Sequence, residues 1–191
     1  MTAAPETEIV SPRETGFHRL PVARVERLCE DAVAVTFDVP DALAPTYRFR
    51  AGQYLTLRLR TDAGEERRSY SICAPEGAAP RIGVRRVDTG LFSQWLVDRL
   101  APGDEVEVAP PEGRFTPDVR AGENHALLAA GSGITPVLSI AATVLAAHPD
   151  NHVTLLYGNR RTDTVMFTED LADLKDRYRH RLQLDHVLSR E

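Results

Sequence analysis

The character of the sequence changes near residue 117, and this change constrains the fold more than any single residue does. Before it, hydrophobic and polar residues alternate in short runs, which is typical of half-buried antiparallel strands. After residue 123, continuous hydrophobic runs alternate with helical patterns, which is typical of parallel strands joined by crossover helices. We therefore expect two domains of different class, with a boundary within 117–123.

The first half predicts a small barrel. Short strands are expected at 21–28, 32–39, 54–60, 67–73, 81–87 and 105–108. Six such strands separated by turn-forming residues favour a closed or nearly closed antiparallel barrel. One helix interrupts them over 91–100, because five large hydrophobic residues fall on one helical face. They are Leu91, Phe92, Trp95, Leu96 and Leu100.

The second half predicts a parallel sheet. Strands are expected at 125–130, 153–157 and 182–188, with helices at 137–147 and 167–178 between them. The first strand is hydrophobic throughout, so we expect it to be buried on both faces. A doubly wound nucleotide-binding domain usually has five or six strands. Three strands therefore indicate a partial domain, and we expect the chain to be a fragment of a longer protein.

Composition excludes several classes of function. The 191-residue chain has a net charge of −5, which disfavours nucleic acid or an anionic membrane as its partner. No hydrophobic run approaches the roughly 20 residues of a membrane-spanning helix, and no signal-peptide pattern is visible, so we expect a cytoplasmic protein. Residues 1–17 predict a flexible lead-in. Two cysteines, Cys29 and Cys73, are too few for an iron–sulfur cluster, and no metal site is predicted.

The segment Arg68-Ser69-Tyr70-Ser71 is the first candidate site. Alternation along a strand places Arg68 and Tyr70 on one face and the two serines on the other. An aromatic ring can stack on a flavin, a guanidinium can bind phosphate, and a hydroxyl can bond a ring nitrogen. The alternative is an ordinary amphipathic strand with a surface arginine and a half-buried tyrosine.

A second candidate is the segment 85–93, where a basic strand leads through Gly90 into the N-terminus of the expected helix. A helix N-terminus carries partial positive charge and suits a pyrophosphate. The alternative is a solvated edge strand followed by a glycine at a helix start.

A third candidate is the segment 131–136, Gly-Ser-Gly-Ile-Thr-Pro, between an expected strand and helix. Its glycines permit a tight turn and let backbone amides approach phosphate oxygens, and Pro136 suits the first helical turn. A sharp turn that binds nothing is the alternative. After the next strand, Asn159-Arg160-Arg161 suits a 2′-phosphate and favours NADPH over NADH, although a solvated basic loop explains it equally well.

Six motifs, taken in order, resemble those of the ferredoxin–NADP reductase superfamily. They are Phe49-x-x-Gly52-Gln53-Tyr54, Arg68-x-Tyr70-Ser71, Gly90-x-x-Ser93, Gly113-x-Phe115, Gly131-x-Gly133-x-x-Pro136 and Tyr157-Gly158-Asn159-Arg160. The resemblance extends from residue 20 to the end and points, within the superfamily, to reductase subunits of phenylacetyl-CoA oxygenase (epoxidase) systems. It implies a flavin-binding Greek-key β-barrel at 18–118, followed by a partial Rossmann-like NAD(P)-binding α/β domain at 119–191.

The resemblance also implies which residues bind cofactors. FAD, which the residues alone do not separate from FMN, would be held by Arg68, Ser69, Tyr70 and Ser71, with Tyr70 and Ser71 at the reacting ring. The residues implied for its pyrophosphate are Val84, Arg85, Arg86, Gly90 and Ser93. The residues implied for NAD(P)H are Gly131, Gly133, Thr135 and Pro136, with Arg160 at the adenosine end.

The function implied is that of an FAD-dependent NAD(P)H oxidoreductase. Hydride would pass from NAD(P)H to FAD, and single electrons would then pass to an iron–sulfur protein or oxygenase component. A 2Fe-2S cluster would belong to a further domain of a longer parent chain. Two alternatives stay open: a non-catalytic flavin- or nucleotide-binding module, and a free flavin reductase.

Overall fold

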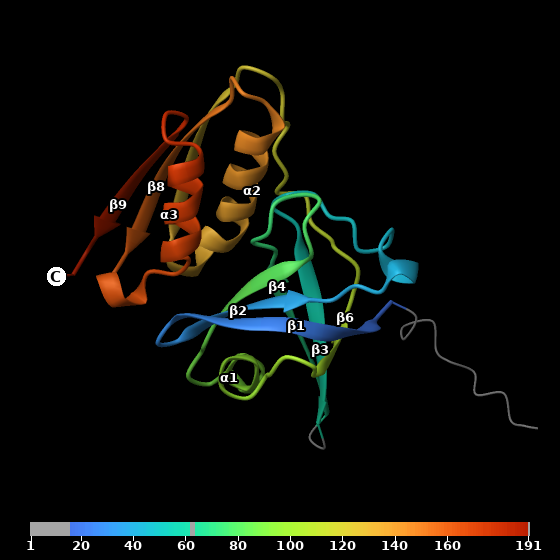
Figure 1. Ribbon diagram of the computed structural model, residues 1–191. Helices are drawn as coiled ribbons and strands as arrows, with labels where there is room; N and C mark the ends of the chain where they lie inside the picture. The colour runs from blue at the N-terminus through green and yellow to red at the C-terminus, as the bar shows by residue number, and fades with distance from the viewer. Residues whose placement is uncertain (1–15, 62–63, 191) are drawn as a thin grey trace, which may run out of the picture.

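The computed structural model describes residues 16–61 and 64–190, and it consists of an antiparallel barrel and an α/β unit (Figure 1). The lead-in predicted for 1–17 lies, apart from its last two residues, outside the described residues. Within the described ranges, no helix has the length and hydropathy needed to cross a membrane.

The barrel has six strands in the order β4-β3-β6-β1-β2-β5. The strands are β1 (His18–Cys29), β2 (Ala32–Phe37), β3 (Tyr54–Thr61), β4 (Gly64–Ser71), β5 (Arg81–Arg85) and β6 (Glu105–Val108). All neighbouring pairs are antiparallel. A bridge between Ile72 and Ile82 brings the two edge strands together. The predicted, nearly closed antiparallel barrel is confirmed.

The barrel core is filled from alternate strand positions and from one helix. Leu55, Leu57, Ile82 and Val84 are fully buried in it. Helix α1 (Leu91–Asp98), which Figure 1 shows on the side of the barrel away from the α/β unit, adds Phe92, Leu96 and Val97. Leu91, expected on the buried face, is exposed instead. The buried face is centred on residues 92, 93, 96 and 97, so Leu91 lies at its flank.

The α/β unit is a three-stranded parallel sheet in the order β7-β8-β9. Its strands are β7 (Asn124–Ala130), β8 (His152–Asn159) and β9 (Leu182–Leu188). Helices α2 (Ile134–Ala147) and α3 (Thr168–Arg177) form the two crossovers, as the sequence predicts. Short 3-10 turns stand at Asp41–Leu43 (η1), Gly131–Gly133 (η2) and Thr162–Thr164 (η3).

Both helices cover the same face of this sheet (Figure 1). On the other face, Leu128 is 74% exposed, Leu156 is 39% exposed and Val187 is also exposed. The expectation that 125–130 is buried on both faces is therefore wrong for the described residues. The reason is topological: both right-handed crossovers advance in the same direction, so both place their helices on one side.

The barrel and the α/β unit share a hydrophobic core. Small barrel residues lie in one cluster with the buried faces of α2 and α3; they are Ala32, Ala34, Ala51 and Cys73. Hydrogen bonds also cross the contact, and two of them join the segment after β4 to α2. The Ser139 hydroxyl donates to the Ala74 carbonyl oxygen over 2.6 Å, and the Glu76 amide donates to the Thr143 hydroxyl over 3.1 Å. The two units are thus packed against one another and not joined only by the chain.

Candidate functional site

An open hollow of about 310 Å³ lies where strands β4 and β5 face the start of α2. The lining residues are Ser69, Tyr70, Ser71, Gly83, Arg85, Arg86, Val87, Ser132 and Thr135. The barrel motif around Tyr70 and the glycine turn before α2, which are about sixty residues apart in the sequence, therefore meet in one place.

Strand β4 lines the hollow with three successive residues, Ser69, Tyr70 and Ser71, so both of its faces contribute. Tyr70 pairs with the core residue Leu55, whereas Ser69 pairs with Thr56, and the hydroxyls of Ser69 and Thr56 are 3.0 Å apart. The Tyr70 ring lies 6.2 Å from the ring of Phe92. Burial raises the pKa of Tyr70 to about 12. Its hydroxyl therefore stays protonated, and able to donate a hydrogen bond, throughout the physiological pH range.

Arg68 does not line the hollow. Its guanidinium donates to the Arg67 carbonyl oxygen over 2.8 Å and pairs with the Glu66 carboxylate over 3.1 Å. The side chain is about half exposed, so only a different rotamer would turn it toward a phosphate.

The basic residues of β5 and the loop after it have separate partners. Arg85 pairs with Asp31 over 3.4 Å and also donates to the Thr164 carbonyl oxygen, so it joins the barrel to the α/β unit. Arg86 pairs with Asp98 of α1 over 3.3 Å. Val84 is fully buried in the barrel core, so only its backbone is available to a cofactor.

Gly90 and Ser93 shape the loop before α1. The buried Ser93 hydroxyl accepts a hydrogen bond from the Val87 amide and donates one to the Gly90 carbonyl oxygen, each over 3.0 Å. A Cβ at position 90 would lie 2.9 Å from the Ser93 Oγ atom, so the loop requires glycine. The loop holds the N-terminus of α1 beside the hollow, where its free amides favour an anion.

A larger cleft of about 710 Å³ lies at the carboxyl ends of β7, β8 and β9, where open α/β sheets bind their ligands. Its lining residues are Asp31, Arg85, Ala130, Gly131, Ser132, Gly158, Asn159, Arg160, Thr164, Val187 and Ser189. Asn159 is 7% exposed, yet neither polar atom of its side chain has a hydrogen-bond partner in the described structure. A buried amide without partners is costly, and a polar ligand in the cleft would satisfy it.

The glycine turn between β7 and α2 forms one wall of this cleft. Gly131 has a φ of 51°, a left-handed conformation that glycine adopts without strain. The Thr135 hydroxyl donates to the Ser132 carbonyl oxygen over 2.9 Å and closes the first turn. Gly133 caps α2 and Pro136 is its third residue; both shape the turn and line neither cavity.

The hollow and the cleft share two lining residues, Arg85 and Ser132. A flat ring bound at Tyr70 and a nucleotide bound at Gly131 would therefore be neighbours. Sequence reasoning included Ser132 and Asn159 in its candidate segments but did not select Gly83 as a site residue. A signal was available for Gly83, because an isolated glycine inside a strand often marks a close approach of another segment.

Comparison with known protein families assigns both halves of the chain. Residues 19–116, about half of the chain, match the oxidoreductase FAD-binding domain, and residues 127–191 match the oxidoreductase NAD-binding domain. The chain belongs to the ferredoxin reductase family. The observed barrel and parallel sheet are the FAD-binding and NAD-binding folds of this family.

Several ferredoxin reductase family members are similar to the chain over most of its length. It is 44% identical over 180 residues to one of the subunits of 1,2-phenylacetyl-CoA epoxidase of Escherichia coli (strain K12), covering 93% of this chain and 51% of that one. It is 39% identical to the ferredoxin reductase component of 3-ketosteroid-9-alpha-monooxygenase of Rhodococcus rhodochrous, covering 88% and 48%. The chain thus spans about half the length of these relatives.

Among solved structures, phthalate dioxygenase reductase superposes with a TM-score of 0.75 at 32% identity, covering 94% of this chain and 55% of that one. That protein is described as a modular structure for electron transfer from pyridine nucleotides to [2Fe-2S]. The FAD/NAD-binding domain of nitric oxide dioxygenase from Vibrio cholerae has a TM-score of 0.80 at 23% identity, covering 92% and 76%. This second likeness bears on the fold alone.

Proposed function

We propose that the chain is the FAD- and NAD(P)H-binding part of an oxidoreductase that delivers electrons to an oxygenase system. The proposal assigns residues 18–118 to an FAD-binding domain and residues 119–191 to an NAD(P)-binding domain. The observation that carries it is the pair of adjoining cavities, which share Arg85 and Ser132. When bound, FAD supplies the redox chemistry by accepting a hydride and releasing electrons singly, while the protein supplies position.

The residues around the hollow have the chemistry that a flavin ring requires. The Tyr70 ring provides an aromatic surface, and its protonated hydroxyl and that of Ser71 are hydrogen-bond donors at the cavity wall. Gly90 and Ser93 hold the N-terminus of α1 for a pyrophosphate, and Arg85 and Arg86 add positive charge beside it.

The cleft has the chemistry that NAD(P)H requires. The amides of the glycine turn suit the pyrophosphate. Arg160 lines the cleft, whereas Arg161 is occupied by Asp163 at 3.1 Å. We infer that Arg160 receives the adenosine 2′-phosphate, which favours NADPH over NADH.

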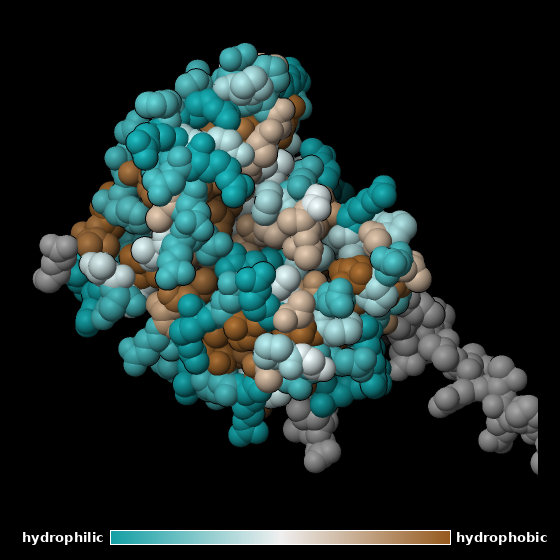
Figure 2. Space-filling model, viewed as in Figure 1, coloured by the Kyte–Doolittle hydropathy of each residue, from teal (hydrophilic) through white to brown (hydrophobic). Residues whose placement is uncertain are grey.

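The names of the relatives support the remaining assignments. Two are reductase components or subunits of oxygenase systems, and one structure is described as transferring electrons to a [2Fe-2S] centre. We propose an iron–sulfur carrier or oxygenase component as electron acceptor, a phenylacetyl-CoA oxygenase as the parent system, and the cytoplasm as the location. Val87, which lines the hollow, and Leu91, the first residue of α1, are exposed. Figure 2 shows a hydrophobic patch on the barrel near α1 that a protein partner would cover.

The test is an anaerobic absorbance spectrum of the purified chain with FAD, before and after adding NADPH or NADH. We expect a bound flavin spectrum that bleaches faster with NADPH. Bound flavin that never bleaches would contradict an oxidoreductase and favour a binding module. Absence of flavin binding would contradict the assignment of Tyr70 and Ser71.

Two variants in the same experiment isolate the nucleotide preference. Arg160→Ala is expected to raise the KM for NADPH about tenfold or more, since a hydrogen bond to a charged group is worth about 1.5–3 kcal/mol, while the KM for NADH stays unchanged. Arg161→Ala, whose side chain pairs with Asp163, is the matched control. Equal effects of the two substitutions on NADPH would contradict the role of Arg160.

A further inference from the structure

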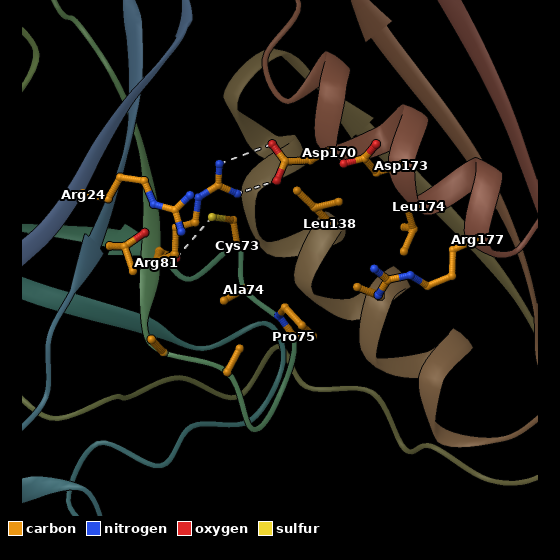
Figure 3. A pocket seen from close by; sticks show the side chains of 14 residues that line it. Arg24, Cys73, Ala74, Pro75, Arg81, Leu138, Asp170, Asp173, Leu174 and Arg177 are labelled. Carbon is orange, nitrogen blue, oxygen red and sulfur yellow. Dashed lines mark hydrogen bonds and ion pairs between the residues drawn. The ribbon is translucent and has the colours of Figure 1, made fainter. Parts of the chain in front are cut away.

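Strand β5 faces the barrel core with one side and the α/β unit with the other. Ile82 and Val84 are buried in the barrel core. On the opposite side, Arg81 binds the Asp170 carboxylate of α3 over 2.5 and 3.3 Å, as Figure 3 shows. Four residues further along the same side, Arg85 donates to the Thr164 carbonyl oxygen. The α/β unit is therefore fixed at both ends of one short strand.

Gly83 lies between these two arginines and has no side chain. A Cβ at this position would lie 2.6 Å from the Cζ atom of Phe167 and 3.0 Å from the Oγ1 atom of Thr135. Both distances are shorter than van der Waals contact. The absence of a side chain at residue 83 thus allows the Phe167 ring and the start of α2 to rest directly on the barrel strand.

The backbone at Phe167 is strained at the place where this contact is made. Its φ is 61°, and among the described residues it is the one non-glycine with a positive φ. This left-handed conformation is costly for a bulky residue and is retained where the surrounding structure requires it. Phe167 precedes α3 and is 1% exposed, with its ring against Gly83 and 5.5 Å from the Arg81 guanidinium.

This contact lies next to the place where the two cofactors would meet. Gly83 and Thr135 both line the hollow around Tyr70, and Thr135 is the second residue of the helix that follows the glycine turn. We propose that Gly83 and Phe167 are positioning residues, whose direct contact sets how closely the nucleotide-binding turn approaches the flavin site. The inference rests on the proposed hydride transfer, which requires reacting atoms about 3–3.5 Å apart.

The test compares the wild-type chain with Gly83→Ala, Phe167→Leu and the double variant. For each we would measure the FAD dissociation constant, the thermal unfolding midpoint, the single-turnover rate of flavin bleaching by saturating NADPH, and the long-wavelength charge-transfer absorbance of the nucleotide stacked on the flavin. Gly83→Ala is expected to lower the rate about 10- to 100-fold and weaken the charge-transfer absorbance, because it separates the two units. FAD affinity should fall by a smaller factor than the rate, since the atoms nearest to the added methyl group belong to the α/β unit.

The double variant and a control sharpen the test. Phe167→Leu removes the Cζ atom that the new methyl group would meet. In the double variant, the logarithm of the rate should therefore recover at least half of the decrease that Gly83→Ala causes. Gly16→Ala, with nothing within 4 Å, should behave as wild type. If the wild-type chain bleaches and Gly83→Ala bleaches at the same rate, the inference is overturned and the proposed function stays intact.

Failure of the wild-type chain to bleach would refute the proposed function itself. If Gly83→Ala does not fold, Phe167→Leu alone decides the matter. It loosens the same contact, and we expect a several-fold slower rate with unchanged FAD affinity. A wild-type rate in that variant would overturn the inference.

Discussion

Gly52 and Gly77 have nearly the same backbone conformation but different surroundings. Their φ angles are 88° and 86°, both in the region where other residues are strained. A Cβ at Gly52 would lie 1.8 Å from the Phe115 carbonyl oxygen, whereas a Cβ at Gly77 would meet nothing within 4 Å. Gly52 is therefore required by close packing as well as by backbone freedom, which explains its place in a motif shared with a superfamily.

Substitution of the two glycines separates these two requirements. Gly77→Ala should lower the free energy of unfolding by about 1–2 kcal/mol, the cost of a left-handed conformation. Gly52→Ala should cost about 3–5 kcal/mol, because overpacking adds to the same strain. Urea denaturation of both variants measures the difference, and equal losses would show that the contact with Phe115 is easily relieved.

At the scale of elements, strand β8 has one face covered by helices and the other face open to solvent. Leu155 is fully buried under α2 and α3, and its neighbour Leu156 is 39% exposed on the opposite face. Successive side chains on a strand point to opposite faces, so this pair compares the two faces at a single place in the sheet.

Alanine substitutions at Leu155 and Leu156 test whether helices cover only one face of the sheet. Leu155→Ala should cost about 2–5 kcal/mol, as is typical of a buried leucine. Leu156→Ala should cost only about 1 kcal/mol, because part of its side chain is already in contact with water and less buried hydrophobic area is removed. Chemical denaturation gives both values. A large loss for Leu156→Ala would show that the open face is covered in solution.

At the scale of the whole molecule, Cys73 lies in the core that joins barrel and α/β unit, and burial raises the pKa of its thiol to about 12. The unfolded chain releases this proton near pH 9, whereas the folded chain keeps it until about pH 12. The stabilisation is therefore complete below pH 9 and is lost as pH rises from 9 to 12.

This titration predicts how stability depends on alkaline pH. The free energy of unfolding should fall above pH 9, with a contribution from Cys73 of up to about 1.4 kcal/mol per pH unit. In Cys73→Ala that contribution is absent, so the stability gap between wild type and variant should narrow between pH 9 and pH 10. Denaturation at pH 7–8, below the range of the thiol, is the reference. A difference in unfolding free energy between wild type and variant that does not change with pH would mean that the thiol has the same pKa in the folded and unfolded chain.

Local patterns predicted most of the elements because their evidence is contained within single segments. The alternation over β3 and the strand–turn–helix around Gly131 each depend on neighbouring residues. The burial of β7 was predicted wrongly, because hydrophobic residues on both faces do not reveal which faces are covered. The partners of Gly83 and Arg85 were also not predictable. They are Phe167, Thr135 and Thr164, which lie 50 or more residues away along the chain.

The small residues that the barrel contributes to the shared core limit how this protein can change over evolutionary time. Ala32, Ala34 and Ala51 are fully buried where they meet α2 and α3, although they belong to the other unit. Exchange of the α/β unit for one from a distant relative would leave this surface without its matching partner. The two halves are therefore expected to be inherited together, with substitutions on one side of the junction compensated on the other.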